Sequence, residues 1–116
     1  MMIQESIFTK IVQRSIPATI VFETEDIIAI RDIAPKAPVH ILVIPKKQIP
    51  TINDISAEDT ILIGKIIIAA KDIAVREGIA ENGYRLIFNC NEYGGQTVWH
   101  IHCHLLGGKK LGWSPD

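Results

Sequence analysis

The segment that decides the fold and the chemistry is Gly95-Gln96-Thr97-Val98-Trp99-His100-Ile101-His102-Cys103-His104-Leu105-Leu106-Gly107-Gly108. Within this segment, three of the chain's four histidines fall in a stretch of five residues. Their β-branched and aromatic neighbours favour a strand, which we predict over residues 98–106. Because side chains alternate along a strand, the imidazoles of His100, His102 and His104 should share one face. The intervening side chains should face the core: Trp99, Ile101, Cys103 and Leu105.

Three imidazoles crowded on one face are more typical of chemistry than of structure, because they would repel one another if charged. They suit either a metal site or a catalytic array, in which a neutral ring attacks through one nitrogen while a hydrogen bond holds the other. The only acidic residue after His104 is Asp116, and Lys109 and Lys110 would oppose a cation. The sequence therefore favours catalysis and ranks metal binding second.

The turn before the histidines offers hydrogen-bond donors. Gly94-Gly95-Gln96-Thr97 combines flexible backbone N–H groups with an amide and a hydroxyl. Such groups suit the oxygens of a phosphate. Next to a row of imidazoles, they indicate a site for chemistry at phosphorus.

The rest of the chain predicts an α+β fold with a largely antiparallel sheet around one long helix. We predict helices over residues 6–14 and 56–78, strands over 20–22, 27–31, 40–44 and 84–88, and an irregular connection over 32–38. In the long helix, apolar residues recur at helical spacing: Ile63, Ile66, Ile67, Ala70, Ile73 and Ala74. Ser56 and Asp59 resemble a capping box, and Gly78 suits the other end.

Length and composition exclude several classes of protein. A chain of 116 residues allows a single domain, here residues 1–116. A net charge of −1 argues against broad capture of nucleic acid or anionic membrane. No apolar run is long enough to span a bilayer, and two cysteines are too few for a disulfide framework. We therefore expect a reduced, cytoplasmic protein that binds neither nucleic acid nor membrane.

The histidine segment resembles the signature of the histidine-triad (HIT) superfamily, in which His-x-His-x-His is followed by apolar residues. The resemblance covers nearly the whole chain and is nearest to the branch of purine nucleoside phosphoramidases. The matching segments are Ile7-Phe8, Ile16-Pro17-Ala18, Arg31-Asp32-Ile33-Ala34-Pro35, Pro38-Val39-His40-Ile41-Leu42-Val43-Ile44-Pro45-Lys46-Lys47 and the tail ending in Trp113. The family implies a five-stranded antiparallel sheet, one long and one short helix, and a homodimer.

The resemblance also implies hydrolysis of adenosine or guanosine phosphoramidates, or of acyl-nucleotides, through a nucleotidylated histidine without metal or cofactor. Carried over to this sequence, His102 is the nucleophile, His104 assists the leaving group, and His40 and His100 orient and tune the others. Asp32 would bind the ribose. The phosphate would lie near Asn89, Gly95, Gln96 and Thr97. The base pocket would be lined by Phe8, Ile11, Ile30 and Ile33.

Three other functions stay open at this point. A dinucleoside polyphosphate hydrolase is the enzymatic runner-up, since Gln96-Thr97 also occurs in that branch, although the short chain and the Leu-Gly-Gly ending favour the phosphoramidases. Transfer to a sugar phosphate is disfavoured because His104 stands where the nucleotidyltransferase branch carries glutamine. The chain could instead be a nucleotide- or partner-binding module with weak activity, or a zinc-binding protein.

Overall fold

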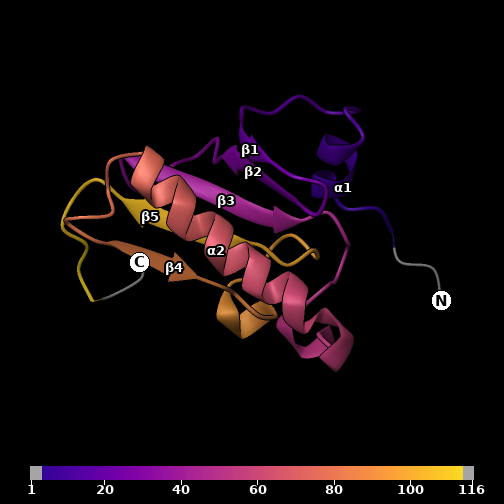
Figure 1. Ribbon diagram of the computed structural model, residues 1–116. Coiled ribbons are helices and arrows are strands. Elements are labelled where there is room, and N and C mark those ends of the chain that lie inside the picture. Colours follow the sequence, from indigo (N-terminus) through magenta and orange to yellow (C-terminus); the bar gives the residue numbers. More distant parts are fainter. Residues whose placement is uncertain (1–3, 114–116) are drawn as a thin grey trace.

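The computed structural model describes residues 4–113, so both ends of the domain predicted over 1–116, Asp116 included, lie outside the described residues. Its centre is one five-stranded antiparallel sheet with the strand order β1-β2-β3-β5-β4 (Figure 1). The strands are β1 (Ile20–Glu23), β2 (Ile27–Arg31), β3 (Val39–Pro45), β4 (Tyr84–Ile87) and β5 (Cys103–Gly107). The helices are α1 (Ile7–Val12) and α2 (Thr60–Arg76), with short 3₁₀ turns η1 (Ile52–Asp54), η2 (Ala57–Asp59) and η3 (Glu92–Gly94). The predicted α+β fold with one long and one short helix is confirmed.

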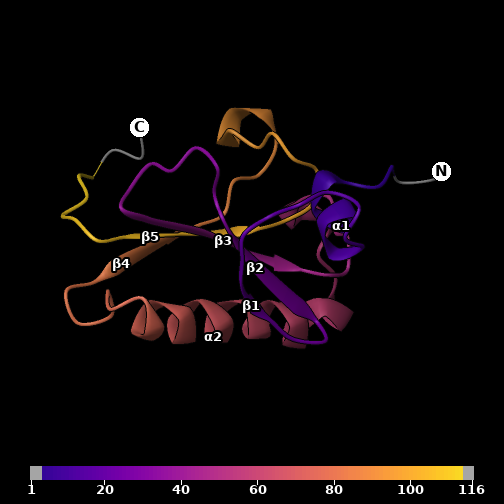
Figure 2. The same ribbon diagram turned by 90° about the horizontal axis from the view of Figure 1, so that it is seen from above.

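The sheet separates two layers. Figure 2 shows α2 along one face, with α1 and the connecting loops toward the other. Alternation along β3 sends Ile41 and Val43 into the core beneath α2, whereas Leu42 and Ile44 pack with Phe8 of α1. His40, two residues before Leu42, therefore lies on the α1 face.

The long helix begins and ends close to the predicted positions. Ser56 and Asp59 form a reciprocal capping box, and Gly78 adopts a φ of 75°, a left-handed conformation that glycine reaches without strain. The buried side of α2 is formed by Ile66, Ala69, Ala70, Ile73 and Ala74. The prediction that Ile67 belongs to this face was wrong. The side chain of Ile67 is 41% exposed, because this residue lies about 100° around the helix from Ile66.

The strand that carries the histidines is shorter than predicted. Pairing with β3 begins only at Cys103, opposite Val43, so residues 98–102 form no ladder. Pro45 explains this, because proline has no N–H to donate and its carbonyl accepts from a side chain, that of His100. Trp99, predicted to face the core, is instead 48% exposed.

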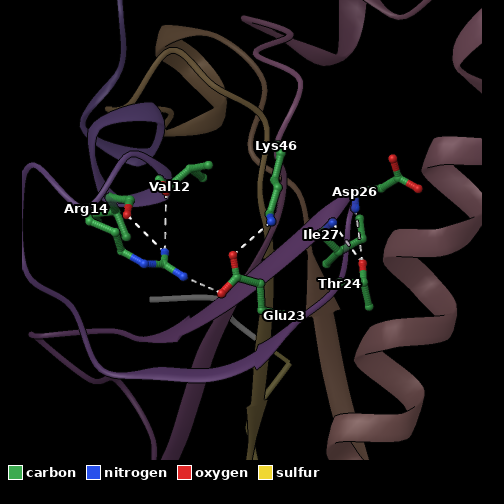
Figure 3. A network of polar contacts seen from close by, with 8 residues as sticks. Val12, Arg14, Glu23, Thr24, Asp26, Ile27 and Lys46 are labelled. Atoms are coloured by element: carbon green, nitrogen blue, oxygen red, sulfur yellow. Dashed lines mark hydrogen bonds and ion pairs between the residues drawn. The ribbon is translucent and has the colours of Figure 1, made fainter.

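The hairpin of β1 and β2 is fastened to its surroundings by polar contacts (Figure 3). The hydroxyl of Thr24 accepts hydrogen bonds from the backbone N–H groups of Asp26 and Ile27, which closes the turn. Glu23 lies 2.5 Å from Arg14 and 2.8 Å from Lys46, and these cations lower the pKa of its carboxyl. The contacts tie β1 both to the end of α1 and to the end of β3.

Both cysteines are free: Cys90 is half-buried and Cys103 fully buried. Among residues 4–113, no helix combines the length and the apolar character that a bilayer crossing requires. The expected cytoplasmic location stays a prediction.

Candidate active site

The four histidines converge on the α1 face of the sheet from three segments. His40 comes from β3, His104 from β5, and His100 and His102 from the extended segment that precedes β5. The ring centroids of His102 and His104 lie 4.9 Å apart, and those of His40 and His104 lie 5.2 Å apart. The three clustered imidazoles thus lie close together, as their spacing predicts, although of these three only His104 lies on a strand.

The hydrogen bonds of His102 leave one ring nitrogen free to react. Its Nδ1 lies 2.8 Å from the carbonyl oxygen of His100. A carbonyl can only accept, so Nδ1 must carry the proton. In the neutral ring the lone pair is then on Nε2, which is the state that a nucleophile needs.

His100 is fully buried, and both of its ring nitrogens have partners. Nε2 lies 2.6 Å from the carbonyl oxygen of Pro45 and must therefore donate. Nδ1 then accepts in the neutral ring, and the hydroxyl of Ser6, 2.6 Å away, is its donor. His100 is locked from both sides, and its own carbonyl in turn holds His102.

His40 and His104 form a directed pair. The backbone N–H of Lys36 donates to Nδ1 of His40 at 3.0 Å, so the proton of the neutral ring is on Nε2. This Nε2 lies 2.9 Å from Nδ1 of His104 and 3.4 Å from a carboxylate oxygen of Asp32. Nδ1 of His104 accepts, which leaves the proton of His104 on Nε2.

Burial keeps the four rings neutral near pH 7. Desolvation is the main cause that lowers the pKa of His40, His100 and His102 below the ordinary value of 6.5. The same cause, with repulsion from His102 and His40, lowers the pKa of His104 to about 4. Asp32 opposes the shift at three of the rings, because a carboxylate favours an imidazolium.

Helix α1 supplies one wall of the site. Phe8 meets the ring of His102 edge-on at 5.0 Å and that of His100 at 5.7 Å. It packs with Ile11 and Ile30 in one apolar cluster, so three of the four residues expected at a base pocket lie together. Ile33, the fourth, is fully exposed in the loop that also carries Asp32.

The loop before the histidines is held by Gln96. Its side chain is buried, accepts from the backbone N–H of Asn91 at 2.8 Å and donates to the carbonyls of Pro50 and Val98. The side-chain amide is thus bonded within the protein, and Gln96 shapes the loop from inside. Asn89 donates to the carbonyl of Gly94 at 2.7 Å. The other two predicted phosphate contacts, Gly95 and Thr97, are exposed on this loop.

Asp32, His40 and His104 are the best candidate metal ligands, because one ligand atom of each lies within 4.8 Å of the others. The hydrogen bonds argue against this role. A metal at Nε2 of His40 would move the ring proton to Nδ1, where it would point at the N–H of Lys36. The residues therefore fit a hydrogen-bond relay better than a metal site.

Sequence reasoning missed the polar residues that support His100. Ser6 was predicted only as a helix start, and neither Thr9 nor Gln48 was singled out, yet the hydroxyl of Ser6 reaches His100 and Gln48 holds α1 in place. Ser6 and His100 are 94 positions apart in the chain. No local pattern could have revealed a contact over that separation.

Known proteins resemble this chain over nearly its full length. The HIT domain family model matches residues 13–111. A purine nucleoside phosphoramidase of Escherichia coli K12 is 56% identical over 111 residues, which are 96% of this chain and 93% of that protein. An uncharacterized HIT-like protein of Synechococcus elongatus is 50% identical over 98% of this chain and 99% of its own length.

A solved structure agrees. The crystal structure of a HIT family hydrolase from Legionella pneumophila Philadelphia 1 superposes with a TM-score of 0.94 at 54% identity, covering 97% of this chain and all of that one. The sequence match, the shared fold and the histidine geometry agree, and the chain belongs to the HIT domain family.

Proposed function

We propose that the protein hydrolyses purine nucleoside 5′-phosphoramidates, and related acyl-nucleotides, to the nucleoside monophosphate. The observation that carries the proposal is the bare Nε2 of His102, left with its lone pair because Nδ1 donates to the carbonyl of His100. The 56% identity to a purine nucleoside phosphoramidase supports the substrate class.

In the first step Nε2 of His102 attacks the α-phosphorus. The Nε2–P bond forms as the P–N bond breaks, and the departing amine takes a proton from solvent while the Nε2–H of His104 holds a phosphate oxygen beside the leaving group. The positive charge that develops on the ring of His102 strengthens its Nδ1–H bond to the carbonyl of His100. The nucleophile thus becomes better held as the intermediate forms.

In the second step water attacks the same phosphorus. The P–Nε2 bond breaks, the hydroxyl stays on phosphorus, and the remaining proton of the water returns to solvent. The cycle restores the free ring of His102 and releases the monophosphate. His40 keeps His104 oriented throughout, because its Nε2–H points at Nδ1 of that ring.

We propose that the nucleoside lies beside these rings. We assign the base to the apolar cluster of Phe8, Ile11 and Ile30, with Ile33 at its outer rim, and the ribose hydroxyls to Asp32. The phosphate oxygens would meet Gly95 and Thr97, with Asn89 and Gln96 holding that loop in shape. Contacts remote from phosphorus would then orient the substrate for attack.

The test is release of AMP from adenosine 5′-phosphoramidate in EDTA, comparing the wild type with His102→Ala. We expect turnover in the wild type and its loss in the variant, with both proteins unfolding at similar urea concentrations. Equal rates in the two proteins, or turnover that requires added metal, would contradict the mechanism. Much faster cleavage of diadenosine triphosphate would favour a dinucleoside polyphosphate hydrolase.

We also propose that the protein is a homodimer, as the family resemblance implies. Strand β4 lies at one edge of the sheet and β1 at the other, which leaves β4 open to pairing. On α2, large apolar side chains are exposed to solvent: Ile61, Ile67, Ile68 and Val75. A second copy of the chain would cover such a surface.

Light scattering coupled to size exclusion tests the dimer. We expect a mass close to twice 12.9 kDa. The substitution Ile68→Glu should shift the mass toward the monomer. Ile33→Glu makes the same change from an apolar to a charged side chain, but in the site loop, and should not shift the mass. A monomeric wild type would refute this proposal without affecting the hydrolase.

A further inference from the structure

Ser6 makes two short contacts through one oxygen atom, besides a longer one of 3.3 Å to the hydroxyl of Thr9. As the N-cap of α1, its Oγ accepts a hydrogen bond from the backbone N–H of Thr9 at 3.0 Å. The same Oγ lies 2.6 Å from Nδ1 of His100, at the far end of the chain in sequence. The cap of a six-residue helix is therefore also a partner of the triad.

The direction of the second contact follows from its surroundings. Because the carbonyl of Pro45 requires the proton of His100 on Nε2, Nδ1 of the neutral ring can only accept. The hydroxyl of Thr9 is 3.5 Å from Nδ1 and donates instead to Gln48 at 2.9 Å. Ser6 is thus the donor that satisfies a fully buried nitrogen.

We infer that Ser6 is a positioning residue of the reaction, whose hydroxyl proton keeps His100 neutral and fixed so that the His100 carbonyl can hold His102 for attack. The inference rests on the proposed function, because that function makes His102 the nucleophile. It adds the N-cap residue of α1 to the groups that hold the histidines.

Ser6 is itself held by Gln48, which explains how a short helix can serve this purpose. The Oε1 of Gln48 accepts from the backbone N–H of Ser6 at 3.1 Å and from the hydroxyl of Thr9 at 2.9 Å. Its Nε2 donates to the carbonyl of Gln4 at 2.8 Å. Three contacts from one side chain thus clamp the first turn of α1 beside the triad.

A charge on His100 would reach the nucleophile directly. His102 is the titratable group that faces His100, and its Nδ1–H donates a hydrogen bond to the His100 carbonyl. The remaining neighbours, Phe8, Thr9 and the carbonyl of Pro45, carry no charge that could balance an imidazolium. Holding His100 neutral therefore keeps the lone pair of His102 Nε2 available for attack.

The substitutions Ser6→Asn and Ser6→Asp separate proton donation from helix capping. Both side chains have the same shape, and both cap helices about as well as serine. Only the amide of asparagine can donate to Nδ1 of His100. An ionised aspartate accepts only, so it would draw a second proton onto the ring.

We expect Ser6→Asp to lower kcat at least about tenfold at neutral pH, and Ser6→Asn to stay within about threefold of the wild type. The KM should change little in either variant, because Ser6 does not touch the substrate. Urea unfolding of both variants establishes that the fold is intact. Equal kcat values for the two variants, whether high or low, would overturn the inference.

The ¹⁵N chemical shifts of the His100 ring give a readout independent of activity. In the wild type and in Ser6→Asn they should show one protonated nitrogen, and in Ser6→Asp two. A neutral ring in Ser6→Asp overturns the inference. If the wild type fails to hydrolyse the phosphoramidate while the shifts follow the expected pattern, the proposed function fails and the role of Ser6 in holding His100 stands.

Discussion

Backbone groups decide which nitrogen of His40, His100 and His102 carries the ring proton. Pro45 and His100 each offer an oxygen that can only accept, and the N–H of Lys36 can only donate. These three groups are fixed by the main chain, so no side-chain rotation can alter them. The tautomer of His102 that we propose as the nucleophile is therefore built into the fold before any substrate arrives.

The lowered pKa of His102 predicts the pH dependence of the reaction. A nucleophile must be neutral, and burial lowers its pKa below 6.5, so kcat/KM should stay level from about pH 8 to 6.5 and fall only at lower pH. Initial rates at low substrate concentration measure this limb. A midpoint at or above pH 6.5 would contradict the prediction.

At the scale of the elements, the agreement between sequence and structure depends on where the backbone hydrogen bonds go. The long helix was predictable because its caps and its apolar spacing are local. The strand over residues 98–106 was predicted too long because its length depends on a partner, β3, which ends at Pro45. Trp99 was placed in the core for the same reason, since alternation was assumed beyond the end of the ladder.

The candidate site shows the same contrast between features that follow from local sequence and features that depend on distant residues. The clustering of the imidazoles on one face follows from spacing, and family resemblance supplied His40, Asp32 and the apolar pocket. The contacts of Ser6 and Gln48 with the triad region are long-range and polar, so neither periodicity nor composition indicates them.

The loop that we propose holds the phosphate should depend on Gln96. In Gln96→Glu the carboxylate would face the carbonyls of Pro50 and Val98 in place of the amide that donates to them. We expect the free energy of unfolding to fall by about 2 kcal/mol. Urea denaturation measures this, with the same chemical change at the exposed Gln4 as a control expected to have little effect.

Gly107, at the end of β5, has no room for a side chain. An added Cβ would lie 2.7 Å from Cδ1 and 3.3 Å from Cβ of Ile79, which is itself buried in the core. We expect Gly107→Ala to lower the free energy of unfolding by about 2 kcal/mol.

Gly64 in α2 is the matched control for this substitution. An added Cβ there meets nothing within 4 Å, so Gly64→Ala should raise the free energy of unfolding by about 1 kcal/mol through helix propensity. Effects of the same sign in the two variants would refute the packing argument.

At the scale of the whole molecule, the four neutral imidazoles make the fold sensitive to acid. In the unfolded chain each ring takes up a proton near pH 6.5, whereas in the folded protein the pKa values lie lower and that of His104 is about 4. The unfolded state therefore binds more protons below pH 6.5. The free energy of unfolding should be greatest above that pH and fall as the pH drops toward 4.

Urea midpoints at one-unit pH intervals test this prediction. The carboxylates with a lowered pKa, Glu23 and Asp59, start from 4.5 and 3.8, so a loss of stability between pH 6.5 and 4.5 reports the histidines. A midpoint that stays constant over that interval would mean that the rings are not held neutral by the fold.

The alternation that aims the imidazoles toward α1 also turns Cys103 away from them. The thiol lies between two reactive rings in sequence, yet it packs beneath α2, and burial raises its pKa to about 12. A thiol in that state is inert to alkylating reagents until β5 leaves the sheet. The rate at which such a reagent labels Cys103 would therefore time the opening of the native sheet, without any engineered probe.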